Sequence, residues 1–261
     1  MRGPGLAWAH LKVGAIYEMQ YRLNFLIQLV QSGLALATGL VAIGLVFSHT
    51  TSLRGWSYPE LLAVMGVHIF LGGVLRAVIL PNMQQFMWQV EQGEFDFTLT
   101  KPVDAQLLIS VRNVRIWQLV DVVVGLVVLG WAVVALNQEV GLYQALLFAI
   151  TLFCGGVILY CLWMLVTTTA FKWVRVEEIT QLMTGIYEAG RWPVSVYPGW
   201  LRLSLTYFIP LAFAITVPAE ALVGRLDAGG VLVALGITAL TVIVTRVFWM
   251  LGLRNYTGAS A

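Results

Sequence analysis

Two residues of opposite charge, Glu188 and Arg191, are the best candidates for chemistry, because they interrupt a chain that is largely apolar. Three positions apart, they would lie on one face of a helix, where they could form an ion pair. A charged group at membrane depth is costly and marks a functional site by default. With the neighbouring Tyr187 and Trp192 they could line a polar path through a membrane, although a structural ion pair at a helix end explains them equally well.

No other grouping of residues predicts catalysis or metal binding. The three histidines occur without a carboxylate cluster, and the sequence has no HExxH or paired CxxC motif. It also lacks the G-x-x-x-x-G-K-[ST] phosphate loop, so the chain is not expected to bind ATP in the usual way. His68, alone in an apolar stretch, is more typical of a packing residue than of a ligand. We therefore predict no catalytic residue, no metal site and no cofactor in this chain.

Two further ionisable residues lie in apolar surroundings. The long side chain of Arg76 is expected to extend to the cytoplasmic surface of the membrane. Asp121 is expected to form a structural ion pair with Arg115. The glycine pairs at 72–73 and 155–156 would permit close contact between helices, which is common in membrane proteins.

The overall composition is that of a membrane protein. Hydrophobic residues make up 59% of the chain and charged residues 11%, and the mean hydropathy is +0.85. Five or six stretches are each apolar for about 20 residues, the length that a helix needs to cross the hydrocarbon core. A helix also satisfies its own backbone hydrogen bonds there. We predict an all-α integral membrane protein, and the small net charge of +2 argues against nucleic-acid binding.

Five of the predicted spans are clear, and one region has two interpretations. The clear spans are residues 25–47, 61–80, 116–136, 142–171 and 231–251. Before the last of them, residues 201–223 are apolar enough to cross, but Pro210 and Pro218 interrupt them. Prolines two turns apart also suit a re-entrant pair of half-helices packed inside protein. The short, polar segment 177–190 would then be the fifth crossing.

Either interpretation gives an even number of crossings and therefore puts both termini on one side of the membrane. Lysine and arginine are more frequent in the connections on that side, so both termini are expected in the cytoplasm. Residues 6–22 are weakly amphipathic and predict an N-terminal helix lying in the interface.

The connection at 82–104 has the most informative polar sequence. It begins with an apolar stripe at i, i+3, i+4 and i+7, formed by Met83, Phe86, Met87 and Val90. Gly93 then breaks the helix, and Glu94 and Asp96 follow in an aromatic-rich segment. A short amphipathic helix with an acidic end suits a groove on a partner protein, and a helix lying on the lipid surface explains the spacing equally well.

Residues 91–102, EQGEFDFTLTKP, resemble the G-E-L/F-D-x-x-L-x-K/R-P loop of permease subunits from type-two ATP-binding-cassette (ABC) exporters. The segment YRLNF at 21–25 resembles the start of the first span in that group, and GLRNY at 252–256 resembles its C-terminal end. The segment RWPVSVYP at 191–198 resembles the stretch before its last span. The resemblance thus covers nearly the whole chain in order, and a bacterial permease family of about this length is the nearest group.

This resemblance implies a transport subunit rather than an enzyme. The chain would pair with a second permease, identical or homologous, and would export a substrate between the two. Separate ATPase subunits would hold ATP and magnesium and would dock on the loop. The docking residues implied are Met83, Phe86, Met87, Val90, Glu91, Gly93, Glu94, Asp96, Lys101 and Pro102.

The resemblance also favours six crossings. Residues 177–190 would be the fifth, and residues 192–224 would form a re-entrant hairpin on the outer side. The expected location is the bacterial inner membrane. Two other classes of function are compatible with the residues alone: a membrane-embedded enzyme or lipid-handling protein with a site near Glu188 and Arg191, and a secondary transporter. The latter would need inverted repeats, which the two halves of the chain do not share.

Overall fold

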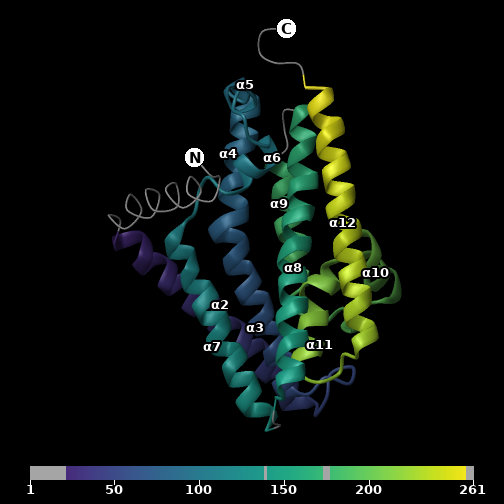
Figure 1. Cartoon of the computed structure of the whole chain (residues 1–261). Coiled ribbons are helices and arrows are strands. Elements are labelled where there is room, and N and C mark those ends of the chain that lie inside the picture. The colour runs from purple at the N-terminus through teal and green to yellow at the C-terminus, as the bar shows by residue number, and fades with distance from the viewer. Residues whose placement is uncertain (1–21, 138–139, 173–176, 257–261) are drawn as a thin grey trace.

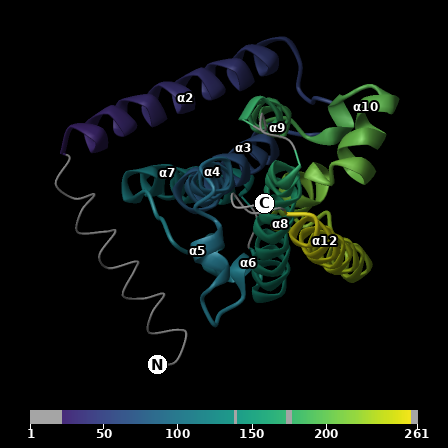
Figure 2. The ribbon, with the colours of Figure 1, turned by 90° about the horizontal axis from the view of Figure 1, so that it is seen from above.

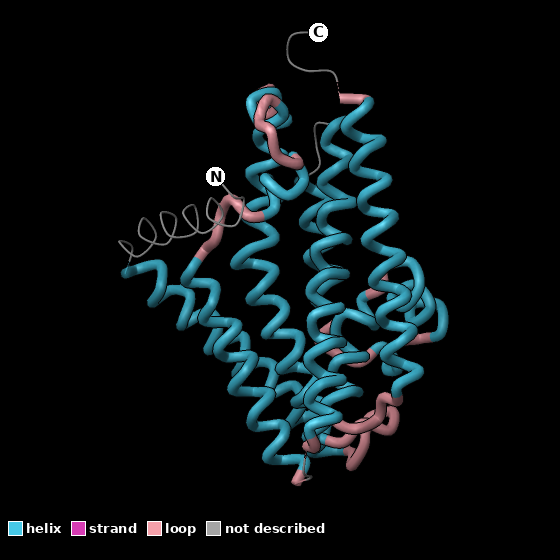
Figure 3. The backbone as a smooth tube through the Cα atoms, in the orientation of Figure 1, coloured by secondary structure: helices cyan, strands magenta, loops and turns pink. Residues whose placement is uncertain are grey.

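The computed structural model describes residues 22–137, 140–172 and 177–256, and these are helical with no strand among them. Figure 3 shows the long helices joined by short loops. The predicted interfacial helix at 6–22 lies almost wholly outside the described residues. The long elements are α2 (Arg22–His49), α3 (Tyr58–Val74) with the π-helical turn η1 (Leu75–Ile79) and α4 (Leu80–Glu91), α7 (Leu119–Leu136), α8 (Leu142–Thr168) and α12 (Ala228–Arg254).

Five helical segments among the described residues are long and apolar enough to cross a membrane, or six if one bent pair of helices counts as a span. Each of the five clear apolar stretches of the sequence lies on one of these segments. The chain is therefore a multi-pass, all-helical membrane protein.

The sequence predicts that the second span ends before Pro81, but the helix does not end there. The helix continues from Tyr58 to Glu91, 34 residues in all. Proline has no N–H to donate to the carbonyl four residues earlier, which is that of Ala77. That carbonyl instead accepts the backbone N–H of Arg115 at 2.9 Å, and η1 widens the helix just before the proline. The loop at 82–104 thus begins inside a continuous helical rod.

The long helices form a bundle in which α3 packs along α7, and α8 packs along α12 (Figure 1). Figure 2 shows α2 along one edge of the bundle, where it contacts α3 and α7. Most of α3 is buried, whereas α2 exposes apolar side chains along most of its length. The loop 82–104 and the ends of α8 and α12 lie at the upper end in Figure 1, and the connection 50–57 lies at the lower end.

A short helix, α9 (Glu177–Ala189), precedes a bent segment of shorter elements. With 13 residues, α9 is shorter than the 20 or so that a bilayer requires. The stretches 199–208 and 212–222 are bent by 79° at Ile209 and Pro210. The elements of the bent segment are η4 (Val194–Val196), α10 (Gly199–Leu203), η5 (Ser204–Phe208), η6 (Ala212–Thr216) and α11 (Val217–Leu222).

Both ends of the bent segment contact the same connection at the lower end. Trp56 donates its indole N–H to the hydroxyl of Ser195 at 3.0 Å. Arg225 donates to the carbonyl of Gly55 at 2.6 Å and to Glu60 at 2.7 Å. Its guanidinium also lies 4.8 Å from the centre of the Trp56 ring. The bent segment therefore leaves the lower end of the molecule and returns to it.

Candidate functional site

The loop at 82–104 is a packed structure at the upper end of the bundle. It comprises the end of α4, the short helix α5 (Asp96–Leu99) and the connection to α6 (Ala105–Ser110). Gly93 lies between α4 and α5 with φ +72°, a conformation that favours glycine. This is the position at which the sequence predicts that the first helix is broken.

The apolar stripe of α4 faces the protein interior. Met83 and Phe86 are fully buried, and Phe95, from the segment after Gly93, joins them. The rings of Phe86 and Phe95 lie 5.3 Å apart, and both also contact Phe171, after α8, and Trp249 of α12. Met83 and Phe86 therefore hold the loop on α8 and α12 and have no surface to offer a partner.

Other residues of the loop are accessible. Glu91, Glu94, Lys101 and Pro102 are exposed, and Met87, Val90, Gly93 and Asp96 are half-buried. The loop also exposes two aromatic groups that were not among the predicted docking residues, Phe97, 73% exposed, and Trp88. The alternation of Phe95 and Phe97 was the available signal, because one ring of such a pair packs inward while the other faces out.

An ion pair ties α6 to α12 below the loop. Arg246 donates to both carboxylate oxygens of Asp104, at 2.5 and 3.2 Å. Asp104 also caps α6 by accepting the backbone N–H of Leu107 at 3.2 Å. The Arg246 guanidinium holds the pKa of the Asp104 carboxyl below its ordinary value.

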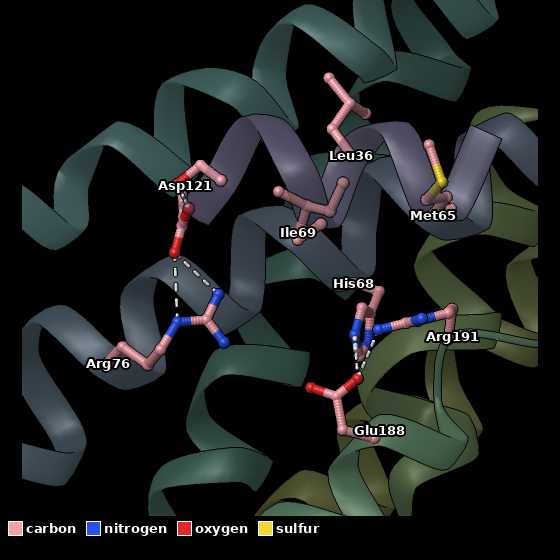
Figure 4. A pocket seen from close by; sticks show the side chains of 11 residues that line it. Leu36, Met65, His68, Ile69, Arg76, Asp121, Glu188 and Arg191 are labelled. Carbon is pink, nitrogen blue, oxygen red and sulfur yellow. Dashed lines mark hydrogen bonds and ion pairs between the residues drawn. The ribbon is translucent and has the colours of Figure 1, made fainter. Parts of the chain in front are cut away.

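A cavity of about 80 Å³ lies at mid-bundle, between α2, α3, α7 and the end of α9 (Figure 4). A water molecule needs roughly 10–15 Å³ of such volume, so the cavity is large enough for several waters or a small polar group. Its walls carry two arginines, two carboxylates, a histidine and a set of small and apolar residues. The lining residues are Ser32, Ala35, Leu36, Gly39, Met65, His68, Ile69, Arg76, Asp121, Glu188 and Arg191.

Two of the four predicted path residues line this cavity. Glu188 accepts a bond from Arg191 at 2.8 Å, and the same oxygen lies 3.7 Å from Nε2 of His68. Tyr187 does not line the cavity; it is buried, stacks on the His68 ring at 4.6 Å and donates to the His68 carbonyl. Trp192 packs against the core and does not line the cavity either.

His68 is buried, as expected of a packing residue, yet it is also part of the polar wall. Its Nδ1 has no hydrogen-bond partner among the described residues. An unsatisfied buried polar atom costs about 1–3 kcal/mol, so its position beside a cavity calls for a ligand or water. No pattern in the sequence pointed to this role, because the residue that faces His68 across the cavity comes from α9, far along the chain.

Asp121 is at the centre of a second polar group. Arg76 donates to it through Nε at 3.1 Å and Nη2 at 2.8 Å, Gln28 donates at 3.1 Å, and Ser32 donates to its other oxygen. The expectations for Arg76 and Asp121 were wrong in detail: Arg76 turns into the bundle instead of extending to the membrane surface. Arg115, the expected partner of Asp121, donates to Gln84 instead at 3.0 Å.

The described residues hold no cluster of histidine, cysteine or carboxylate side chains that could bind a metal ion.

The model of a family described as "ABC-2 family transporter protein" matches residues 34–260. The chain belongs to the ABC-2 transporter family. Neither the curated proteins nor the solved structures give a match. ABC-2 membrane proteins are permease subunits that work with ATPase subunits, so this chain is a transmembrane permease of an ABC transporter.

Proposed function

We propose that the chain is one of two permeases in a bacterial ABC exporter of the inner membrane, with separate ATPase subunits docked on the loop at 82–104. The second permease, identical or homologous, completes the substrate path. Both termini and the loop face the cytoplasm, where the ATPase subunits bind ATP and magnesium. The lower end of the bundle faces outward.

One observation carries the proposal: the first part of the loop is a continuation of a helix that runs the length of the bundle. The continuous helix from Tyr58 to Glu91 joins the connection 50–57 at the lower end to the loop 82–104 at the upper end. The aromatic contacts of Phe86 and Phe95 with Trp249 fix the loop to α12 as well. A force that a partner applies to the loop would therefore move α3 and α12 together.

The docking surface we propose consists of the exposed part of the loop. Phe97 and Trp88 would supply the apolar contact, and Glu91, Glu94, Lys101 and Pro102 the surrounding polar rim. Aromatic side chains are common anchors in protein interfaces. Asp96, Met87, Val90 and Gly93 would contribute at the edge, while Met83 and Phe86 act indirectly by holding the loop in place.

The contacts at the lower end favour the re-entrant interpretation of residues 192–224. Because Ser195 and Arg225 both bind the connection that contains Trp56, the segment between them does not need to reach the other side. The chain would then cross six times, with residues 177–190 as a short fifth crossing. The carboxylate and guanidinium at its end would face the cavity and not lipid, as charge at membrane depth requires.

Co-purification with the ATPase subunit tests the proposal, and two exposed phenylalanines provide a matched pair. Phe97→Ala should reduce the ATPase recovered with the permease about tenfold or more, as expected for a buried aromatic anchor. Phe208, 86% exposed on η5, is far along the chain from the loop, so Phe208→Ala should leave recovery unchanged.

Charge reversal tests the polar rim independently. Replacing Glu94 and Asp96 by lysine should release the ATPase or uncouple hydrolysis from transport while the permease still inserts into the membrane. Normal recovery of the ATPase with all of these loop variants, together with normal substrate-stimulated hydrolysis, would exclude the loop as the docking site.

A further inference from the structure

Both arginines of the mid-bundle cavity keep N–H donors that no described residue accepts. Four bonds, from Arg76, Gln28 and Ser32, occupy the two oxygens of Asp121. The side chain of Asp121 is 5% exposed, whereas that of Arg76 is 37% exposed. Among the described residues, nothing accepts from Nη1 of Arg76 or from Nε and Nη1 of Arg191. Guanidinium groups with spare N–H donors favour an anionic group such as phosphate or carboxylate.

One wall of the cavity is apolar. It is formed by Ala35, Leu36 and Gly39 of α2 and by Met65 and Ile69 of α3. A free inorganic anion would leave this wall without a partner, whereas an acyl chain would bury it. The two walls together therefore match a molecule with an anionic headgroup and an apolar tail.

His68 adds a third feature. With the proton on Nε2, the nitrogen 3.7 Å from the Glu188 carboxylate, Nδ1 is an acceptor without a partner among the described residues. A hydroxyl group near the anionic group of the ligand, or a water molecule held with it, would satisfy this atom.

We propose that the cavity binds the headgroup of an anionic, single-chain or lipid-like amphiphile, with its phosphate or carboxylate between Arg76 and Arg191. That this ligand is the transported substrate rests on the proposed function, but the binding itself does not need the ATPase. Glu188 competes with the ligand for Arg191, because its carboxylate already accepts from that side chain. Releasing Arg191 from Glu188 is then part of binding.

Native mass spectrometry of the full chain in neutral maltoside micelles can measure binding of three probes with the same acyl chain. Lysophosphatidylglycerol is anionic and has hydroxyl groups, lysophosphatidylcholine is zwitterionic, and monoacylglycerol is neutral. We expect the anionic probe to bind at least tenfold more tightly than monoacylglycerol, the difference made by about one charge-assisted hydrogen bond to the phosphate. Lysophosphatidylcholine, whose phosphate is partnered by its own choline cation, should bind with intermediate affinity. Inorganic phosphate alone should bind weakly.

Three variants locate the site. Arg191→Gln should weaken binding of the anionic probe about tenfold, and Glu188→Gln should strengthen it by removing the competing carboxylate. The pair Arg76→Gln with Asp121→Asn removes both charges of this ion pair at once, avoids leaving the buried carboxylate unpaired, and should also weaken binding. Arg246→Gln is the matched control, because Arg246 is a half-exposed arginine paired with an aspartate outside the cavity.

Other results would overturn the inference while leaving the proposed function intact. Equal binding of all three probes would mean apolar adsorption only, and equal binding of inorganic phosphate would mean a free-anion site. Weaker binding of lysophosphatidylglycerol to Glu188→Gln would mean that Glu188 assists the headgroup instead of competing with it. Loss of ATPase docking with normal probe binding, by contrast, would contradict the proposed function alone.

Discussion

The Glu188–Arg191 pair lines a polar cavity that is large enough for water, so we treat it as a solvated ion pair. The two side chains are 43% and 40% exposed, and they bond three positions apart at 2.8 Å. Exposed ion pairs contribute roughly 0.2–1 kcal/mol to stability. We therefore expect Glu188→Gln to leave thermal stability nearly unchanged and to alter transport or substrate-stimulated ATP hydrolysis. A thermal-shift assay and a hydrolysis assay on the same complex measure the two effects.

The opposite pattern would assign the pair a structural role. In that case Glu188→Gln would lower the yield or the unfolding temperature of the complex and leave hydrolysis per complex unchanged. A double variant with Arg191→Gln refines the test, because two partners of a structural pair lose less together than the sum of the two single losses.

The sequence identified the charged residues near the cavity but not their partners. It predicted Glu188 and Arg191 as a group, because residues three apart on one helix are neighbours whatever the fold. It wrongly paired Asp121 with Arg115, which is near in sequence, where the structure pairs it with Arg76 on another helix. Contacts between helices depend on how each helix is rotated, and hydropathy carries little information about that rotation in a chain this apolar.

At the scale of elements, three prolines shape this bundle, and only Pro210 lies at a helix end. Pro81 follows η1, Pro210 follows η5 and Pro218 follows η6. Each π-helical turn lies in the residues whose carbonyls a proline cannot bond. The sequence predicted a break at Pro210 correctly, whereas Pro218 lies inside the continuous helical stretch 212–222. It was also wrong at Pro81, where the N–H of Arg115 replaces the missing bond.

Glycines set how closely α3 and α7 approach. A Cβ at Gly125 would lie 2.5 Å from the backbone nitrogen of Phe70, and one at Gly73 would lie 2.6 Å from that of Val122. The sequence singled out Gly73 for close helix contact but missed Gly125. Because a backbone atom cannot move aside as a side chain can, these two positions exclude any larger residue without a shift of the whole helix.

We expect Gly125→Ala to destabilise the bundle by about 1–3 kcal/mol, the usual cost of overpacking. Gly130 is on the same helix, and a Cβ added there would have no neighbouring atom within 4 Å, so Gly130→Ala is the matched control. The control should be neutral or slightly stabilising, since alanine is the better helix former. Unfolding midpoints in one detergent compare the two, and equal midpoints would contradict the tight crossing.

The ion pair between α6 and α12 predicts a dependence of stability on pH. Because Arg246 lowers the pKa of Asp104 in the folded protein, the pair stabilises the fold at pH values above the unfolded pKa of about 3.9. This stabilisation is lost as the pH falls through the folded pKa. Both side chains are partly exposed, so its size should be about 0.5 kcal/mol.

Asp104→Asn isolates this charge, because asparagine caps a helix as well as aspartate does. The variant should unfold at a lower temperature than the parent at pH 6, and the difference should vanish near pH 3. Asp227 caps α12 without a cation partner in the described part of the chain, so Asp227→Asn should show no such convergence. A deficit of Asp104→Asn that is the same at both pH values would assign the effect to capping alone.

At the scale of the whole molecule, function depends on which elements reach which end. The sequence predicted the long helices well, because about 20 apolar residues in a row have few other solutions. It left the region after α8 open, because α9 is too short to register as a span and the bent segment is apolar enough to register as one. Hydropathy does not separate the two interpretations, because they differ in contacts distant in sequence, such as that of Trp56 with Ser195.

Labelling with a membrane-impermeant thiol reagent tests the resulting topology in intact cells. The native cysteines, Cys154 and Cys161, are both buried, so background labelling should be low. Ser52→Cys places a thiol in the connection at the lower end, and Gln92→Cys places one in the exposed part of the loop at the upper end. These two variants calibrate outside and inside labelling.

Ser195→Cys then decides whether the bent segment is re-entrant. The Ser195 hydroxyl accepts from Trp56, and Arg225 at the far end of the segment binds the same connection. We therefore expect the Ser195→Cys variant to be labelled from outside, as Ser52→Cys is. In that case α9 and the residues after it must make the fifth crossing. Glu188, which lines the cavity, then belongs to a segment that passes through the membrane. Labelling of Ser195→Cys only after the membrane is opened, as for Gln92→Cys, would instead make the bent segment the fifth crossing and put the Glu188–Arg191 pair on the cytoplasmic side.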